Sequence, residues 1–124
     1  MQYFLCNHCG NIAELVRDGG AEMHCCGEPM RRLDKDGMVG AAEKHLPVVK
    51  VSDGLVKVSV AETPHPMSEE HYVGWIALET DKGTQRKAFL PSDTPEATFP
   101  ILDGEAPKEV YAFCNLHGLW NKKL

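Results

Sequence analysis

The chain has no long hydrophobic run and no excess of basic residues. None of its apolar stretches approaches the roughly 18 residues that a membrane helix needs, so we expect no membrane span. Thirteen lysines and arginines stand against 18 aspartates and glutamates, which gives a net charge of −5. Because non-specific nucleic-acid binding requires a basic face, this balance argues against it. An anionic substrate is not excluded, since a metal ion or a local cation can focus the field at one site.

The beginning of the sequence also lacks the features of a secretory leader. Residues 1–6 contain neither a basic segment nor an extended apolar one, so we expect no signal peptide and a cytoplasmic location. The chain has no internal repeat and no low-complexity segment. It has five cysteines, an odd number. In a reducing compartment, clustered cysteines indicate metal ligands rather than disulfides.

Four of the five cysteines lie within 21 residues of one another: Cys6, Cys9, Cys25 and Cys26. The first two form a Cys-x-x-Cys-Gly knuckle, and the last two are adjacent. Adjacent side chains of a regular strand point to opposite faces, so both can reach one metal only if the backbone turns there, which Gly27 and Pro29 favour. We predict a tetrathiolate site that holds iron or zinc. His8 and His24 lie nearby, but four thiolates already complete a tetrahedron.

The organisation of the chain predicts two parts. Residues 1 to about 33 are too few to bury a sufficient core, and a bound metal is the usual source of the missing folding free energy. A polar linker is expected at residues 33–37, and residues 41–45 could form one helical turn. Short strand candidates separated by Pro, Gly and Asp then predict a β-sandwich. They cover residues 55–60, 72–79, 86–90, 97–102 and 109–113.

A second group of metal-binding side chains lies in the C-terminal part. Cys114-x-x-His117 directly follows a predicted strand, and His65 stands between two prolines that stiffen its backbone. His71 and His45 lie at further strand or loop boundaries. Each alone is unremarkable, but together they predict one site. Four imidazoles and one thiolate leave one position of an octahedral metal open and suit iron or copper, whereas structural zinc takes four ligands.

These motifs, in this order, resemble the two-iron superoxide reductases, or desulfoferrodoxins. They are Cys6-x-x-Cys9, Cys25-Cys26-Gly27-Glu28-Pro29-Met30, Glu43-Lys44-His45, His65-Pro66-Met67, Glu70-His71-Tyr72 and Cys114-Asn115-Leu116-His117-Gly118-Leu119-Trp120. The resemblance implies an all-β protein with two domains. A small desulforedoxin-like domain over residues 1–36 would hold Fe(Cys)₄, and an immunoglobulin-like β-sandwich over residues 37–124 would hold Fe(His)₄(Cys).

The resemblance further implies a one-electron reduction of superoxide to hydrogen peroxide. Four equatorial ligands are expected at the second iron, His45, His65, His71 and His117, with Cys114 as the axial ligand. Lys44 is the cation expected to attract superoxide, and Glu43 is expected to occupy the sixth position in the ferric resting state. A homodimer that receives electrons from rubredoxin is also implied.

Two other functions fit part of the pattern. One is a cupredoxin-like copper carrier that uses Cys114, His117 and one upstream histidine, but no methionine follows His117 to serve as the usual axial ligand. The other is a zinc-stapled binding module without chemistry. The histidine-rich group in the C-terminal part argues against it.

Overall fold

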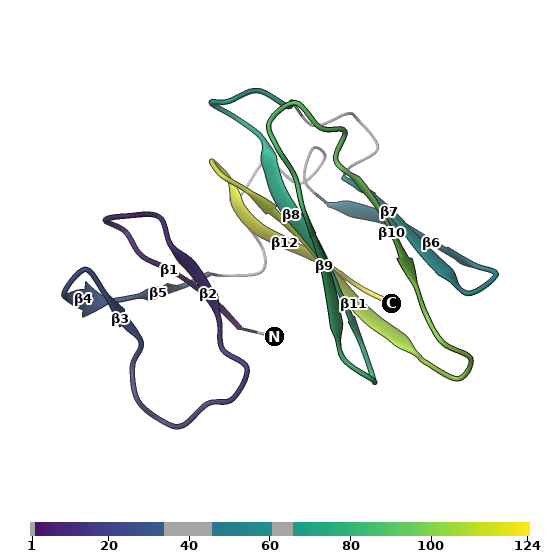
Figure 1. Ribbon diagram of the computed structural model, residues 1–124, viewed down its shortest axis with the longest axis horizontal. Coiled ribbons are helices and arrows are strands. Elements are labelled where there is room, and N and C mark those ends of the chain that lie inside the picture. Colours follow the sequence, from purple (N-terminus) through teal and green to yellow (C-terminus); the bar gives the residue numbers. More distant parts are fainter. Residues whose placement is uncertain (1, 34–45, 61–65) are drawn as a thin grey trace. The chain divides into compact units, whose positions relative to one another are not determined.

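The computed structural model describes residues 2–33, 46–60 and 66–124. Every regular element in these ranges is a β-strand, which confirms the expected all-β class (Figure 1). The strands are β1 (Tyr3–Leu5), β2 (Ile12–Glu14), β3 (His24–Cys25), β4 (Glu28–Pro29), β5 (Arg31–Arg32), β6 (Pro47–Ser52), β7 (Leu55–Val60), β8 (Val73–Thr80), β9 (Thr84–Ala88), β10 (Glu96–Pro100), β11 (Pro107–Cys114) and β12 (Gly118–Lys123).

Several sequence predictions concern residues outside the described ranges. They are the linker after Leu33, the helical turn at residues 41–45, and the roles of Glu43, Lys44, His45 and His65. The described part of the chain contains no helix long and apolar enough to cross a membrane.

The chain divides into two compact units, Met1–Asp34 and Lys35–Leu124. The smaller unit has a three-stranded antiparallel sheet in the order β2-β1-β5 and a separate β3-β4 hairpin. Its buried apolar side chains within residues 2–33 are Tyr3, Cys6 and Leu33, and one of these is a thiol of the cysteine cluster. So small a core agrees with the expectation that a metal contributes to folding.

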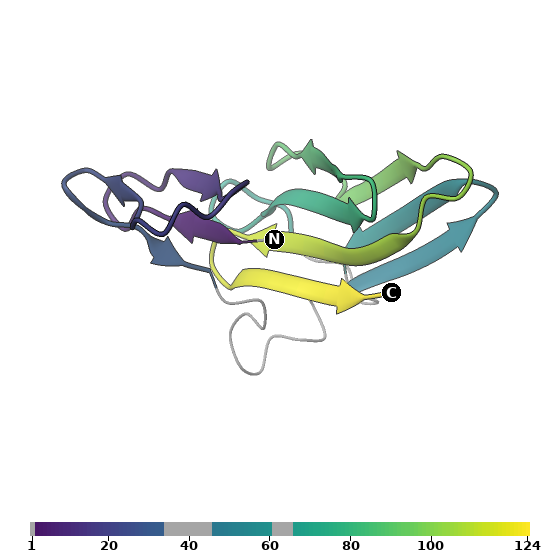
Figure 2. The ribbon, with the colours of Figure 1, turned by 90° about the horizontal axis from the view of Figure 1, so that it is seen from below.

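The larger unit contains two antiparallel sheets. One has the order β10-β7-β6 and the other the order β12-β11-β8-β9. Alternation along β7 directs Val56, Val58 and Val60 inward, where they join one apolar cluster with residues of β8, β10 and β11. Because this cluster draws on both sheets, the unit is a β-sandwich. Figure 2 shows β11 and β12 as long neighbouring strands, in yellow-green and yellow.

Two features of this sandwich position a second site. The β11 and β12 strands are joined by a three-residue loop, residues 115–117, between the paired Cys114 and Gly118. The pairing of β11 with β8 is irregular between Phe113 and Cys114, where a register shift occurs. Such a bulge redirects side chains at the end of a strand. Cys114 therefore closes one end of β11, next to the residues that precede β8.

Candidate metal centres

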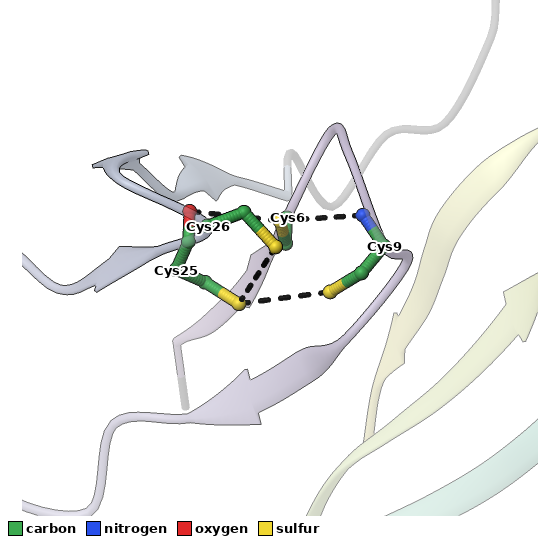
Figure 3. A group of neighbouring side chains, drawn as sticks. All are labelled: Cys6, Cys9, Cys25 and Cys26. Carbon is green, nitrogen blue, oxygen red and sulfur yellow. Dashed lines mark hydrogen bonds between the residues drawn. The ribbon is translucent and has the colours of Figure 1, made fainter.

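The four clustered cysteines converge in space. Their sulfur atoms all lie within 4.8 Å of one another, and none is part of a disulfide (Figure 3). Cys9 Sγ lies 3.6 Å from Cys25 Sγ, and Cys25 Sγ lies 3.9 Å from Cys26 Sγ. Four sulfurs bound in a tetrahedron at about 2.3 Å from a metal lie about 3.8 Å apart. The donor set and its spacing therefore fit one tetrathiolate metal ion.

A tight turn lets the adjacent cysteines reach the same point. Cys25 pairs with Glu28 across the β3-β4 hairpin, so Cys26 and Gly27 form its two-residue loop. Both loop residues have positive φ angles, 54° for Cys26 and 78° for Gly27. Positive φ at both positions is typical of a type I′ turn, although it is uncommon for a residue other than glycine. The turn expected at Gly27 is thus present, and it brings both sulfurs into the group.

The knuckle before it prepares one sulfur as a thiolate. Gly10, with φ of 79°, donates its N–H to the Cys6 carbonyl at 3.0 Å and closes the turn. The backbone N–H groups of Cys9 and His8 donate to Cys6 Sγ and lower the pKa of Cys6 to about 6, and Cys9 makes the larger contribution. Side-chain hydrogen bonds raise the pKa of Cys26 to about 12, and the bond with Cys9 contributes more than the bond with Cys6. Four thiolates at neutral pH therefore require a cation at their centre.

The second group lies where β11 ends and β8 begins. Ligand atoms of His71, Cys114 and His117 all lie within 4.8 Å of one another. Cys114 Sγ is 3.9 Å from His117 Nδ1, and the rings of His71 and His117 meet edge to face with centroids 4.9 Å apart. This mixed nitrogen and sulfur set suits a transition metal. Three of the five predicted ligands are therefore brought together, while His45 and His65 lie outside the described residues.

Burial shapes the chemistry of Cys114. Its side chain is buried, and desolvation raises the pKa of its thiol, while backbone N–H groups of His117 and Leu116 act in the opposite direction. A buried thiolate needs a nearby cation, and a bound metal supplies one. Cys114 is thus suited to be an inner ligand and poorly suited to be a free nucleophile.

Among the described residues, the cysteine cluster does not include the two nearby histidines, His8 and His24. His8 Nε2 lies 2.8 Å from Glu28 Oε2, and His24 Nε2 lies 3.5 Å from Glu22 Oε2. Each ring thus faces a carboxylate and lies outside the tetrathiolate group. Asn11, which the sequence analysis does not single out, contacts that group through Nδ2, 3.6 Å from Cys25 Sγ. Its position two residues after Cys9 is the only sequence signal for this contact.

Both parts of the chain match one protein family. Residues 38–123 match the family described as desulfoferrodoxin, and residues 1–33 match its N-terminal domain. The chain belongs to the desulfoferrodoxin family. The desulfoferrodoxin of Syntrophotalea carbinolica is 41% identical over 124 residues, which cover 99% of this chain and 96% of that protein.

Two solved structures extend the comparison. The superoxide reductase of Treponema pallidum is 37% identical, with a TM-score of 0.82, and the match covers 98% of this chain and 96% of that one. The one-iron superoxide reductase of Giardia intestinalis is 34% identical, with a TM-score of 0.57, and the match covers 66% of this chain and 97% of that one.

Desulfoferrodoxins carry two iron centres, and the two ligand groups of this chain fit them. The tetrathiolate group suits one iron, and the group with His71, Cys114 and His117 suits the other. Two iron ions per chain are therefore its cofactors. A copper carrier would account only for the His-Cys group, and a zinc-stapled module only for the tetrathiolate group. Neither is favoured, because both parts of the chain match the desulfoferrodoxin family.

Proposed function

We propose that this chain is a superoxide reductase, which adds one electron and two protons to superoxide and releases hydrogen peroxide without forming O₂. The observation that carries this proposal is the group of His71, Cys114 and His117 within a desulfoferrodoxin chain. The similarity of the chain to the Treponema pallidum superoxide reductase over nearly its whole length supports it.

The proposed ligands of the catalytic iron are His45, His65, His71, Cys114 and His117. When bound, the iron supplies the electron and one open coordination position. The chain contributes a buried sulfur from Cys114. Desolvation raises the pKa of its thiol, so the thiolate form needs the positive charge of a bound metal. The end of β11 with its following loop and the segment before β8 hold three of the five side chains so that their ligand atoms lie within 4.8 Å of one another.

Two further residues have proposed roles beside the ligands. Lys44 attracts the anionic substrate, and Glu43 occupies the sixth position of the ferric resting state. Lys44 directly precedes His45, and Glu43 directly precedes Lys44, so binding of His45 to the iron would bring both residues close to it. The net charge of −5 makes a local cation necessary for rapid capture of an anion.

The superoxide chemistry is assigned to the larger part, residues 37–124, and the tetrathiolate iron to residues 1–36. The one-iron superoxide reductase of Giardia intestinalis supports this division. Its match covers 66% of the chain, far more than the 34 residues of the smaller unit, so most of it falls in the larger unit. The larger unit also has its own core around Val56, Val58 and Ile76. We further propose a cytoplasmic homodimer that receives electrons from rubredoxin.

Metal analysis combined with product analysis tests this function. The purified protein should contain about two irons per chain, and a thiolate-to-iron band should bleach on reduction. The reduced protein should form one hydrogen peroxide for each superoxide consumed and release no O₂. A superoxide dismutase would instead yield half as much peroxide together with O₂. A colourless zinc protein, or O₂ release, would contradict the proposal.

A further inference from the structure

The segment that carries His71 is folded by short-range hydrogen bonds. Ser68 N donates to the His71 carbonyl at 2.9 Å, and His71 N donates to Ser68 Oγ at 3.2 Å. Val73 N lies 3.3 Å from Met67 Sδ, as a donor to the thioether. These contacts shape the turn before β8. They do not determine where the turn lies relative to Cys114, because all of them join residues close in sequence.

The side chain of Asn115 links this turn to the loop that carries the other two ligands. Asn115 follows Cys114 directly and lies two residues before His117. Tyr72 N donates to Asn115 Oδ1 at 2.8 Å, and Asn115 Nδ2 donates to the Glu70 carbonyl at 3.0 Å. The backbone adds a third bond, from Asn115 N to the Tyr72 carbonyl at 3.2 Å.

These bonds hold the two peptide groups that flank His71. The Glu70 carbonyl belongs to the peptide before His71, and the Tyr72 N–H belongs to the peptide after it. Among neutral side chains, only the amides of Asn and Gln present a separate carbonyl acceptor and an N–H₂ donor. Two bonds of opposite direction, one on each side, limit both the translation and the rotation of the His71 backbone relative to the loop at residues 114–117.

We propose that Asn115 is a positioning residue for the iron site, which holds His71 at ligand distance from Cys114 and His117. The inference rests on the proposed function, because it treats these three side chains as iron ligands. An asparagine that only shaped its own turn would bond to backbone two to four residues away. The partners of Asn115 lie 43 and 45 residues away and belong to the segment of a different ligand.

Loss of the Asn115 amide should therefore loosen one ligand without removing any. Residues that orient metal ligands typically change metal affinity by about 10-fold to 100-fold when mutated. Asn115→Ala should accelerate iron loss from the reduced His-Cys site to a chelator by about that factor. It should also shift the thiolate band and the ferric electron paramagnetic resonance of that site. The band of the tetrathiolate iron, measured in the same sample, should not change.

Asn121→Ala is the matched control. Asn121 is also an asparagine that follows β11, and its Nδ2 donates to Glu109 Oε1 at 2.5 Å, but its strand pairing places it opposite Tyr111, away from Cys114. Its removal should leave the iron-loss rate and both spectra of the His-Cys site as in the wild type. If Asn115→Ala and Asn121→Ala change them equally, Asn115 has only a general stabilising role and the proposal is overturned.

A second variant covers the case in which Asn115→Ala does not accumulate as folded protein. Asn115→Asp keeps an acceptor for Tyr72 N–H and loses the donor toward the Glu70 carbonyl, so its iron should be lost faster than from the wild type. Wild-type rates and spectra in the aspartate variant would overturn the proposal. A wild-type protein without a thiolate band from the His-Cys site would instead contradict the proposed function itself.

Discussion

The two metal centres of this chain are built in opposite ways. The cysteine group takes all four sulfurs from a segment of 21 residues, and its unit buries only Tyr3, Cys6 and Leu33 as apolar side chains within residues 2–33. The His-Cys group takes ligands from two distant segments of a β-sandwich that has its own apolar core. In the first case the metal stabilises the fold, and in the second the fold positions the metal ligands.

The largest difference should appear when the metals are removed. Chelation under reducing conditions should unfold the smaller unit, because its thiols lose the cation that compensates them and its core is too small. The β-sandwich should remain folded around Val56, Ile76 and Val110, which are fully buried. Amide hydrogen exchange of β1 and β11 in the metal-free protein measures both. Retained protection in β1 would mean that the smaller unit folds without its metal. Lost protection in β11 would mean that the β-sandwich also depends on its metal.

The next largest effect concerns the sulfur of Cys114, a proposed ligand of the second iron. Cys114→Ser should abolish the thiolate band of the second iron and slow its reaction with superoxide by at least about 100-fold, since an oxygen ligand donates less charge to the metal. The tetrathiolate band should persist. Optical spectra and pulse radiolysis of the reduced variant measure the two effects. An iron-loaded variant with the wild-type spectrum and rate would show that Cys114 is not a ligand.

The contrast between the centres also explains what the sequence can predict. The tetrathiolate group is local, so its residue types and spacing are sufficient, and Gly27 marks the turn that Cys26 needs. The alternating segment at residues 55–60 likewise coincides with β7. A pattern within a few residues determines each of these features.

Features that depend on distant segments are harder to predict. Strands β6 and β12 are absent from the predicted strands. The start of β12, Gly118-Leu119-Trp120, shows no alternation of polar and apolar residues, whereas Val49-Lys50-Val51-Ser52 in β6 does alternate and is a signal that the prediction misses. The strand expected at residues 86–90 lies instead at Thr84–Ala88, where pairing with β8 determines its ends. The bonds from Asn115 to the segment around His71 depend on tertiary contact, which local periodicity cannot reveal.

A smaller effect is expected at Lys44, the residue proposed to attract the substrate. Lys44→Ile should keep the iron and its ligands, yet slow the bimolecular step with superoxide by about tenfold, equivalent to roughly 1.4 kcal/mol. The rate of the variant should also depend less on salt, because salt screens the attraction between superoxide and the ammonium group that the variant lacks. The Debye length is about 10 Å at 0.1 M salt. Pulse radiolysis of both proteins across a salt series measures this. Equal rates with equal salt slopes would mean that the iron alone attracts the anion.

The smallest effect tests whether the two centres act independently. Cys9→Ser should alter the spectrum of the tetrathiolate iron, because one of its four sulfurs is replaced by oxygen. It should leave the reaction of pre-reduced protein with superoxide within about twofold of the wild type, since the ligands of the catalytic iron belong to another unit with a separate core.

The appropriate comparison for this variant is Cys114→Ser, because both replace one sulfur ligand by oxygen at different centres. Both variants are reduced fully before mixing, so electron supply through the smaller unit cannot limit the measured step. If Cys9→Ser keeps its second iron but loses the fast reaction, the smaller unit takes part in superoxide chemistry. The division of labour between the two units would then be wrong, even though each metal group is assembled as described.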